Sequence, residues 1–328
     1  MLNEISHSIP SKSRQILCYS IIKEGHYGDW ERALQVLTGC RVLKTFWSEL
    51  FMLFTRRKII YLDADQKHLI FVPLMLLREL WGGQNYLISI RTEYLLFPTL
   101  KGAVKRKIYA FLKRYSAASI ISIHKGVQTD RYKQYITDYI YDLQYWDLPY
   151  MDTEQQLPPE LQDWQPEKPV VLFIGALNDK KSRMELLEFL DRNDTLQFYL
   201  VIAGRIMLQD QELLEQHPDC ILINRYVENP EMFYLYSQAD VIYSFYTPDT
   251  NRPSGIFGRA IQFCKPVIVR KGGFLHLTNQ EYEGLIPIDD IEELNRKCND
   301  HLPTITGGNQ FDDSRTLLGI LGDMHTIE

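Results

Sequence analysis

A glycine-bearing loop in the second half of the sequence has residue types that could bind a phosphate. Residues 251–257 read NRPSGIF, follow the strand-like segment Val241–Phe245 and open the helix-like segment Phe257–Phe263. The first turn of a helix offers amides without carbonyl partners and the positive end of a dipole, which suits an anion such as a diphosphate. Gly255 and Gly258 would let the backbone approach that anion closely. Ordinary strand-to-helix turns also contain glycine, so the loop alone leaves both interpretations open.

A lysine lies where it could neutralise such an anion. Lys181 comes a few residues after the strand-like run Val170–Ile174, which ends at Gly175. Residues just past the carboxyl ends of parallel strands lie at the ligand-binding edge of a doubly wound sheet. Lys181 is therefore the first candidate for a diphosphate ligand, and an ordinary surface lysine is the alternative.

The segments that must position these residues alternate between strands and helices. In the first half we expect strands at Gln15–Ile22, Lys58–Leu62, Asn85–Ile90 and Ala118–Ile123, and helices at Trp30–Thr38, Lys67–Trp81 and Lys101–Tyr115. In the second half we expect strands at Val170–Ile174, Phe198–Ala203, Cys220–Ile223, Val241–Phe245 and Pro266–Val269, and helices at Ser182–Asp191, Pro230–Gln238 and Phe257–Phe263. This alternation predicts parallel sheets covered by helices on both faces. The expected fold class is α/β, with two doubly wound, Rossmann-like domains.

The length of 328 residues also favours two domains, because single cores stop growing at about 250–300 residues. Residues 151–169 carry four prolines among many polar residues, which is typical of a linker. We therefore expect an N-terminal domain at 1–150, a linker at 151–169 and a C-terminal domain at 170–328. The last helix could pack back on the N-terminal domain.

Taken in order, the second-half segments resemble the nucleotide-binding domain of group 1 glycosyltransferases with the GT-B fold. The resemblance covers roughly residues 170–275 and rests on five pieces in the family's order: Gly175-Ala176-Leu177 with Lys181, Val201 to Gly204, Tyr236 to Ser244, Ala260 to Ile268, and Gly272-Gly273. It implies two Rossmann-like domains facing across a cleft. It further implies a nucleotide-sugar donor on the C-terminal domain and an acceptor on the N-terminal domain.

The sequence departs from this family at charged positions. Asn251 and Arg259 stand where the family has two glutamates, and Ala176 replaces its arginine. Arg259, together with Arg252, could supply the missing positive charge, since arginine suits bidentate phosphate contacts; the alternative is an exposed helix arginine. The resemblance implies a donor site formed by Lys181, Gly175, Tyr226, Asn251, Arg252, Ser254, Gly255, Ile256, Phe257 and Arg259, with Tyr226 near the base or merely packed.

Three residues of the first half are candidates for the acceptor side. An inverting transferase needs a carboxylate or a histidine to take the proton of the attacking hydroxyl. His26 and Asp29 follow the first strand, and Glu93 follows the strand Asn85–Ile90. Asp29 could instead cap the helix that begins at Trp30. Retaining members of the family often have a histidine near positions 91–93, and the absence of one here favours inversion.

The composition of the chain excludes some classes of binding partner and indicates others. The net charge of −6 argues against nucleic acid, and five scattered cysteines without a CxxC pair indicate reduced thiols of a cytoplasmic protein. No cofactor or metal is expected, and Asp63-Ala64-Asp65, which resembles the metal-binding DxD of GT-A enzymes, is better explained as a loop.

The N-terminus lacks the apolar run of a signal peptide. Residues 101–115 form a basic amphipathic segment that could contact anionic lipid on the inner face of the cytoplasmic membrane, or be an ordinary helix with its apolar face in the core.

These observations together predict a glycosyltransferase that moves a sugar from a nucleotide-sugar to a glycan or lipid-linked saccharide in surface polysaccharide synthesis. One alternative is a catalytically degenerate GT-B-like protein that binds a glycan or a partner, since both glutamates and the arginine of the family are absent. Another is a sugar-nucleotide epimerase on the same fold.

Overall fold

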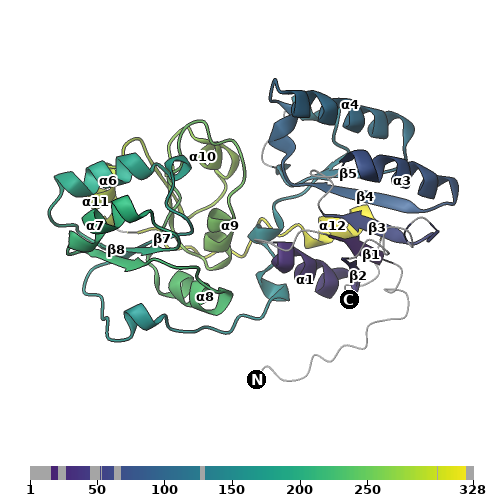
Figure 1. Cartoon of the computed structure of the whole chain (residues 1–328). Coiled ribbons are helices and arrows are strands. Elements are labelled where there is room, and N and C mark those ends of the chain that lie inside the picture. Colours follow the sequence, from purple (N-terminus) through teal and green to yellow (C-terminus); the bar gives the residue numbers. More distant parts are fainter. Residues whose placement is uncertain are drawn as a thin grey trace. The chain divides into compact units, whose positions relative to one another are not determined.

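The structure is a computed structural model that describes residues 16–20, 27–44, 52, 54–62, 68–125, 130–300 and 302–322. The chain divides into two compact units, both drawn in Figure 1. Unit 1 comprises residues 1–143, 149–151 and 312–328, and unit 2 comprises residues 144–148 and 152–311. Short pieces of chain therefore cross between the units near residues 143–152 and again near residue 312.

Unit 1 is built on a six-stranded sheet in the order β2-β1-β3-β4-β5-β6, with parallel pairing throughout. Its elements are β1 (Ile16–Tyr19), α1 (Tyr27–Thr38), β2 (Arg41–Leu43), β3 (Lys58–Tyr61), α3 (His68–Leu80), β4 (Gln84–Ser89), η2 (Thr92–Leu95), α4 (Leu100–Tyr115), β5 (Ser119–Ser122), α5 (Asp130–Lys133), β6 (Asp138–Tyr139) and α12 (Ser314–Leu321). Its strands are mostly buried, as expected of a sheet covered on both faces. Because α3 and α4 join successive strands in one direction, both pack on the same side of this sheet, next to each other (Figure 1).

The end of the chain belongs to unit 1. The Lys58 ammonium donates to the Leu321 carbonyl at the end of α12. Asp313, just before α12, accepts from the Tyr141 amide at 2.7 Å and pairs with Lys125. The last described helix is thus held by one strand of the sheet and by the segment that follows β5.

Unit 2 has a six-stranded parallel sheet in the order β12-β11-β10-β7-β8-β9. Its elements are β7 (Val170–Ile174), η7 (Asp179–Lys181), α6 (Arg183–Arg192), β8 (Tyr199–Ala203), α7 (Leu208–Gln216), β9 (Cys220–Ile223), α8 (Asn229–Gln238), β10 (Val241–Tyr243), α9 (Gly255–Gln262), β11 (Val267–Arg270), α10 (Phe274–Thr278), β12 (Leu285–Ile288) and α11 (Glu293–Asn299). Numbered from its own first strand, the order is 3-2-1-4-5-6, that of the dinucleotide-binding Rossmann fold. The strand order reverses between β7 and β10.

The predicted fold class is confirmed, since both sheets are parallel and interleaved with helices. The expected strands and helices lie within a few residues of the observed ones. The short edge strands β2 and β6 were not predicted, because two or three residues are too few to show a periodic pattern.

The proline-rich stretch is not a free connector. Residues 152–169 are part of unit 2, where the Gln156 amide donates to the Pro230 carbonyl at 3.1 Å. Arg225 forms ion pairs with Glu160 of this stretch at 2.8 Å and with Glu231 of α8 at 2.7 Å. The stretch thus lies along α8, held by backbone and charged contacts.

Candidate functional site

The point where the strand order of unit 2 reverses is the expected ligand site of such a sheet, at the carboxyl ends of the strands. Here these are the ends of β7 at Ile174 and of β10 at Tyr243. Gly175 follows β7 with φ +88°, a conformation that favours glycine. A Cβ at Gly175 would lie 2.8 Å from Lys181 Nζ and 3.8 Å from Ile256 Cδ1. Lys181 and the first turn of α9 therefore meet around Gly175.

Lys181 is the cation closest to this point. Its Nζ donates a hydrogen bond to the Ile174 carbonyl at 2.8 Å and lies 4.9 Å from the centroid of the Phe173 ring. Burial, and secondarily the positive charge of Arg252, lowers the pKa of Lys181 from about 10.5 to about 7. Lys181 is therefore partly neutral beside a second cation, and it can take up a proton when an anion binds.

The N-terminus of α9 supplies amide groups at the same place. Ser254 caps the helix, and its Oγ accepts from the Phe257 amide at 3.3 Å and lies 2.8 Å from the Tyr246 hydroxyl. The Gly258 amide donates to the Ser254 carbonyl at 2.9 Å. The amides of Gly255 and Ile256 lie in the first turn of α9, so the helix itself has no carbonyl that could accept from them.

The loop after β10 is fastened to the loop after β7. The Thr247 amide donates to the Lys180 carbonyl at 3.0 Å. Arg270, the last residue of β11, donates to the Tyr246 carbonyl at 2.8 Å and pairs with Glu185 of α6 at 2.7 Å. An open pocket of about 230 Å³ lies beside these contacts, lined by Ser244, Tyr246, Thr247, Thr250, Arg270, Gly273, Phe274 and Leu275. Arg270 and Tyr246 were not predicted from the sequence, since their partners come from loops far apart along the chain.

Arg259, for which the sequence suggested a diphosphate contact, forms an ion pair with Asp147. Its side chain is 2% exposed, so the expectation of an exposed helix arginine is wrong. The guanidinium forms a bidentate pair with Asp147, with Nη2 3.1 Å from Oδ2. Gln262 donates to Asp147 at 3.0 Å and to the Gln144 carbonyl at 2.7 Å. Arg259 therefore fastens residues 144–148 to α9 within unit 2.

The two glycines of α9 also serve this packing. A Cβ at Gly258 would lie 2.4 Å from Tyr145 Cδ1 and 2.6 Å from the Gln144 carbonyl oxygen. A Cβ at Gly255 would lie 2.2 Å from Gln144 Oε1. These two glycines do allow a close approach to the backbone of α9, and the group that approaches it is the segment 144–148.

The other predicted donor residues differ in their burial and in their distance from Gly175. Ile256 lies at the site, while the Phe257 ring is fully buried and packs against Tyr145. Asn251 and Arg252 are exposed on the loop before α9, and Arg252 is close enough to influence Lys181. Tyr226 is 76% exposed on the loop after β9, so the expectation that it is merely packed is wrong.

Of the predicted residues in unit 1, Glu93 lies just beyond the carboxyl end of β4, and Asp29 lies on α1, the helix that follows β1. Asp29 is in the first turn of α1, which begins at Tyr27, so Asp29 follows the helix start rather than capping it. His26 and the Asp63–Asp65 motif lie outside the described residues. Glu93 lies on η2 after β4 and is buried, with its Oε2 3.6 Å from Nε2 of His124.

His124 was not among the site residues predicted from the sequence. It follows β5, the neighbour of β4, and packs edge-on against the Tyr132 ring. A histidine is therefore present in space near positions 91–93, although it is absent from that stretch of sequence. The position of His124 therefore removes the reason for favouring an inverting reaction. The available signal was its place directly after a predicted strand.

A set of buried polar groups surrounds this pair. Lys105 of α4 donates to the Arg91 carbonyl at 2.7 Å and to Ser89 Oγ at 3.3 Å. Thr92 Oγ1 lies 2.9 Å from Ser122 Oγ. Polar residues thus gather at the carboxyl ends of β4 and β5, on the edge of the sheet where ligands bind, whereas the strand order of unit 1 reverses between β1 and β3.

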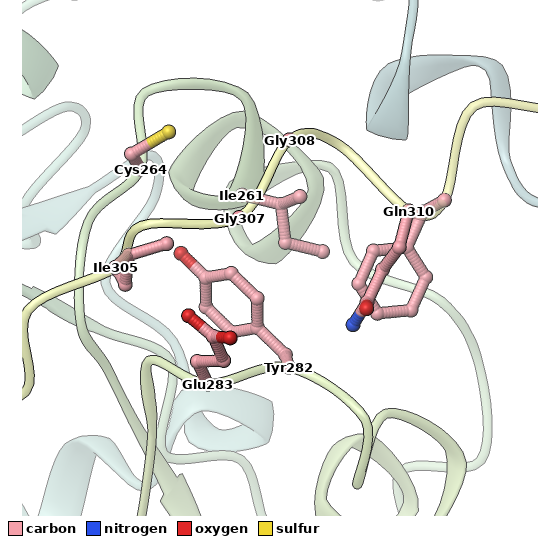
Figure 2. Close-up of a pocket in the computed structure, with 9 residues that line it drawn as sticks. Ile261, Cys264, Tyr282, Glu283, Ile305, Gly307, Gly308 and Gln310 are labelled. Carbon is pink, nitrogen blue, oxygen red and sulfur yellow. The ribbon is translucent and has the colours of Figure 1, made fainter.

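A second pocket lies at the opposite edge of the unit 2 sheet, before β11 and β12. It encloses about 310 Å³, part of it open to solvent, and Figure 2 shows the Tyr282 ring reaching across it toward Ile305. The Tyr282 hydroxyl donates to the Lys265 carbonyl at 2.8 Å. Because it borders the amino ends of these strands, this pocket is not where a sheet of this order binds nucleotides.

Among the described residues, no group of three or more histidine, cysteine, aspartate or glutamate side chains could hold a metal ion. None of the helices described there has both the length and the apolar character needed to cross a bilayer.

Known structures share this architecture. The chain is similar to Anabaena Alr3699/HepE in complex with UDP-glucose, with a TM-score of 0.58 and 13% identity over 87% of this chain and 88% of that one. It is also similar to S. aureus MnaA in complex with UDP, with a TM-score of 0.56 and 12% identity over 96% and 98% of the two chains. The chain has the GT-B fold.

A putative UDP-N-acetylglucosamine 2-epimerase from Listeria monocytogenes has the same GT-B fold, with a TM-score of 0.55 and 11% identity over 96% of this chain and 98% of that one. No protein-family model matches the sequence, and no curated protein matches it. At these identities the likeness extends to the fold, and the chemistry must be argued from the site.

Proposed function

We propose that this protein is a glycosyltransferase that uses a nucleotide-sugar donor. The observation that carries the proposal is the meeting of Lys181 with the first turn of α9 around Gly175, where the strand order of unit 2 reverses. Positive charge and amide donors at that point suit a diphosphate. UDP-glucose and UDP in the similar structures make uridine nucleotides the first to test.

In this proposal the donor site acts on the leaving group. Transfer of the sugar leaves a nucleoside diphosphate that carries new negative charge. The Lys181 ammonium, the Arg252 guanidinium and the amides of Gly255 and Ile256 would stabilise that charge. The Lys181 ammonium is held before the reaction by the Ile174 carbonyl, and the first turn of α9 is held by the Ser254 cap, which lowers the reorganisation that the reaction requires.

The acceptor is proposed to be a glycan or lipid-linked saccharide handled by unit 1, in surface polysaccharide synthesis. Glu93 is the favoured general base, because it lies at a carboxyl edge and has a histidine 3.6 Å away that can share its proton. Asp29 and His26 are the alternatives. None of the five cysteines, all of which lie within the described residues, is part of a disulfide, which suits a reducing cytoplasmic compartment.

A sugar-nucleotide epimerase is a second candidate. It needs acid and base groups near the sugar, and the buried Glu93 and His124 pair is the observation that favours it. A binding protein without turnover is the third, since Ala176 and Asn251 replace charged residues of the glycosyltransferase pattern.

A screen of UDP-, GDP-, CMP- and dTDP-sugars separates these functions. A ligand that binds only the folded chain raises its melting temperature, so a transferase or an epimerase shows a shift with at least one donor. A transferase then releases free nucleotide in the presence of an acceptor extract. An epimerase changes the sugar while the nucleotide stays attached, which NMR detects. If no nucleotide sugar shifts the melting temperature, the proposal fails.

A further inference from the structure

One face of helix α4 carries a stripe of exposed apolar side chains. Leu100 is 81% exposed, Val104 37%, Phe111 43% and Tyr115 64%. Their spacing of four, seven and four residues places them on one side of a 3.6-residue helix. A solvent-exposed stripe of four large apolar side chains is unusual on a helix that already packs against a sheet.

The opposite face of α4 makes the contacts with unit 1. Its buried residues are Gly102, Lys105, Tyr109 and Leu112. The expectation that the apolar face of this helix lies in the core holds for only part of that face, since Ile108 packs against the core. Leu112 is buried, whereas Val104 and Phe111 face solvent.

Free positive charge flanks the stripe. Lys101, Lys107 and Arg114 are exposed, and none of them forms a hydrogen bond or ion pair with another described residue; the Arg114 guanidinium lies 5.3 Å from the centroid of the Tyr115 ring. The other cations of α4 are engaged: Lys113 donates to the Ile136 carbonyl at 2.6 Å, and Arg106 to the Leu95 carbonyl at 2.9 Å. The helix has no acidic residue, although the whole chain has a net charge of −6.

More apolar surface surrounds α4. Of the seventeen large hydrophobic residues exposed in the described part of the chain, nine lie within residues 77–115. Leu96 and Phe97 precede the helix, and Leu77, Leu80 and Trp81 lie at or just past the end of α3. That end is tied to α4, because Glu79 accepts from Ser116 Oγ at 2.6 Å, and Figure 1 shows the two helices next to each other.

We propose that this surface, the outward stripe of α4 with Leu96, Phe97 and the end of α3, docks unit 1 on a membrane of anionic lipids. Apolar side chains would enter the boundary between headgroups and acyl chains while Lys101, Lys107 and Arg114 pair with lipid phosphates. Charge complementarity selects this partner. A basic helix on an acidic protein gains from an anionic surface, whereas a second copy of the chain would bring the same positive charges against it.

Flotation of the full chain with vesicles tests the proposal. Vesicles of equal parts phosphatidylglycerol and phosphatidylcholine should carry the protein, and phosphatidylcholine alone should carry much less. Replacing both Lys107 and Arg114 by glutamine should weaken binding roughly 25-fold, about fivefold for each cation. Binding should also fall in 1 M salt, where the screening length is about 3 Å.

An apolar pair of substitutions has a matched control. Leu100→Ser with Phe111→Ser should reduce vesicle binding at least tenfold by the roughly 0.8 kcal/mol that each buried methylene contributes. Leu208→Ser, at an 86% exposed position on α7 of unit 2, should leave it unchanged. All these positions are exposed, so the variants should melt like the wild type.

Three results would overturn the proposal. One is no flotation with anionic vesicles at low salt. Another is equal flotation of the wild type and the Leu100→Ser, Phe111→Ser variant. The third is self-association that this variant abolishes while vesicle binding is absent, which would make the surface a contact between copies. Nucleotide binding and sugar transfer play no part in these measurements, so their outcome is separate from that of the proposed function.

Discussion

Lys181 should make nucleotide binding depend on pH. Its pKa of about 7 in the free protein means that half of the molecules carry the ammonium at pH 7 and roughly one in a hundred at pH 9. A bound diphosphate favours the charged form. Affinity should therefore fall about 50-fold between pH 7 and pH 9, which corresponds to about 2.3 kcal/mol.

Titration calorimetry of a nucleotide sugar, whose diphosphate stays ionised over this range, measures the effect. Buffers with different ionisation heats should reveal uptake of about half a proton per complex at pH 7 and nearly one at pH 9. Lys181→Arg keeps its charge throughout, so its affinity should change little with pH. Lys181→Met should bind weakly at every pH, and Lys180→Met, at the exposed neighbouring position, should behave like the wild type.

The same pKa predicts how stability varies with pH. The folded-state pKa of Lys181 is lowered from about 10.5, so the unfolded chain binds more protons between pH 7 and pH 10.5. The free energy of unfolding contributed by this group therefore rises with pH in that window, by about 2 kcal/mol from pH 7 to pH 9. The difference in unfolding free energy between the wild type and Lys181→Met isolates the contribution of this group.

For the binding experiment, nucleotide binding without proton uptake, at an affinity that is the same at pH 7 and pH 9, would refute the role given to Lys181.

Three further outcomes follow. Gly258→Ala should destabilise the protein by about 1–3 kcal/mol in urea unfolding, because its Cβ would meet the Gln144 carbonyl; an unchanged midpoint would contradict that packing. Asp147→Asn should cost about 3–5 kcal/mol of stability by leaving Arg259 buried without its carboxylate, yet leave the nucleotide Kd of the folded protein unchanged. Glu93→Gln should slow turnover at least 100-fold with an unaltered donor Kd, and full activity would exclude it as the base.

The sequence predicted the local elements because each strand is a short buried run between turn signals. It could not predict the strand order, which depends on pairing between distant segments. That order matters, since it identifies the ends of β7 and β10 as the point of reversal. Lys181 was found because its place after a strand is a local signal.

Long-range partners explain the errors in the site. Asp147 lies 112 residues before Arg259, so nothing near Arg259 in the sequence indicates a buried ion pair. Gly258 looks the same whether a ligand or another chain segment fills the space of its missing Cβ. His124 meets Glu93 only because β4 and β5 are neighbours. The periodicity of α4 likewise showed an amphipathic helix without indicating which apolar residues face outward.

A crystal structure of the protein with a bound UDP-sugar is the most direct test of the central claim. If Lys181 and the first turn of α9 bind the donor, a diphosphate oxygen lies about 3 Å from Lys181 Nζ and a second lies at the amide of Gly255 or Ile256. Diphosphate bound instead at the opposite edge of the unit 2 sheet, around Tyr282, or elsewhere with Lys181 still donating only to the Ile174 carbonyl, would contradict it.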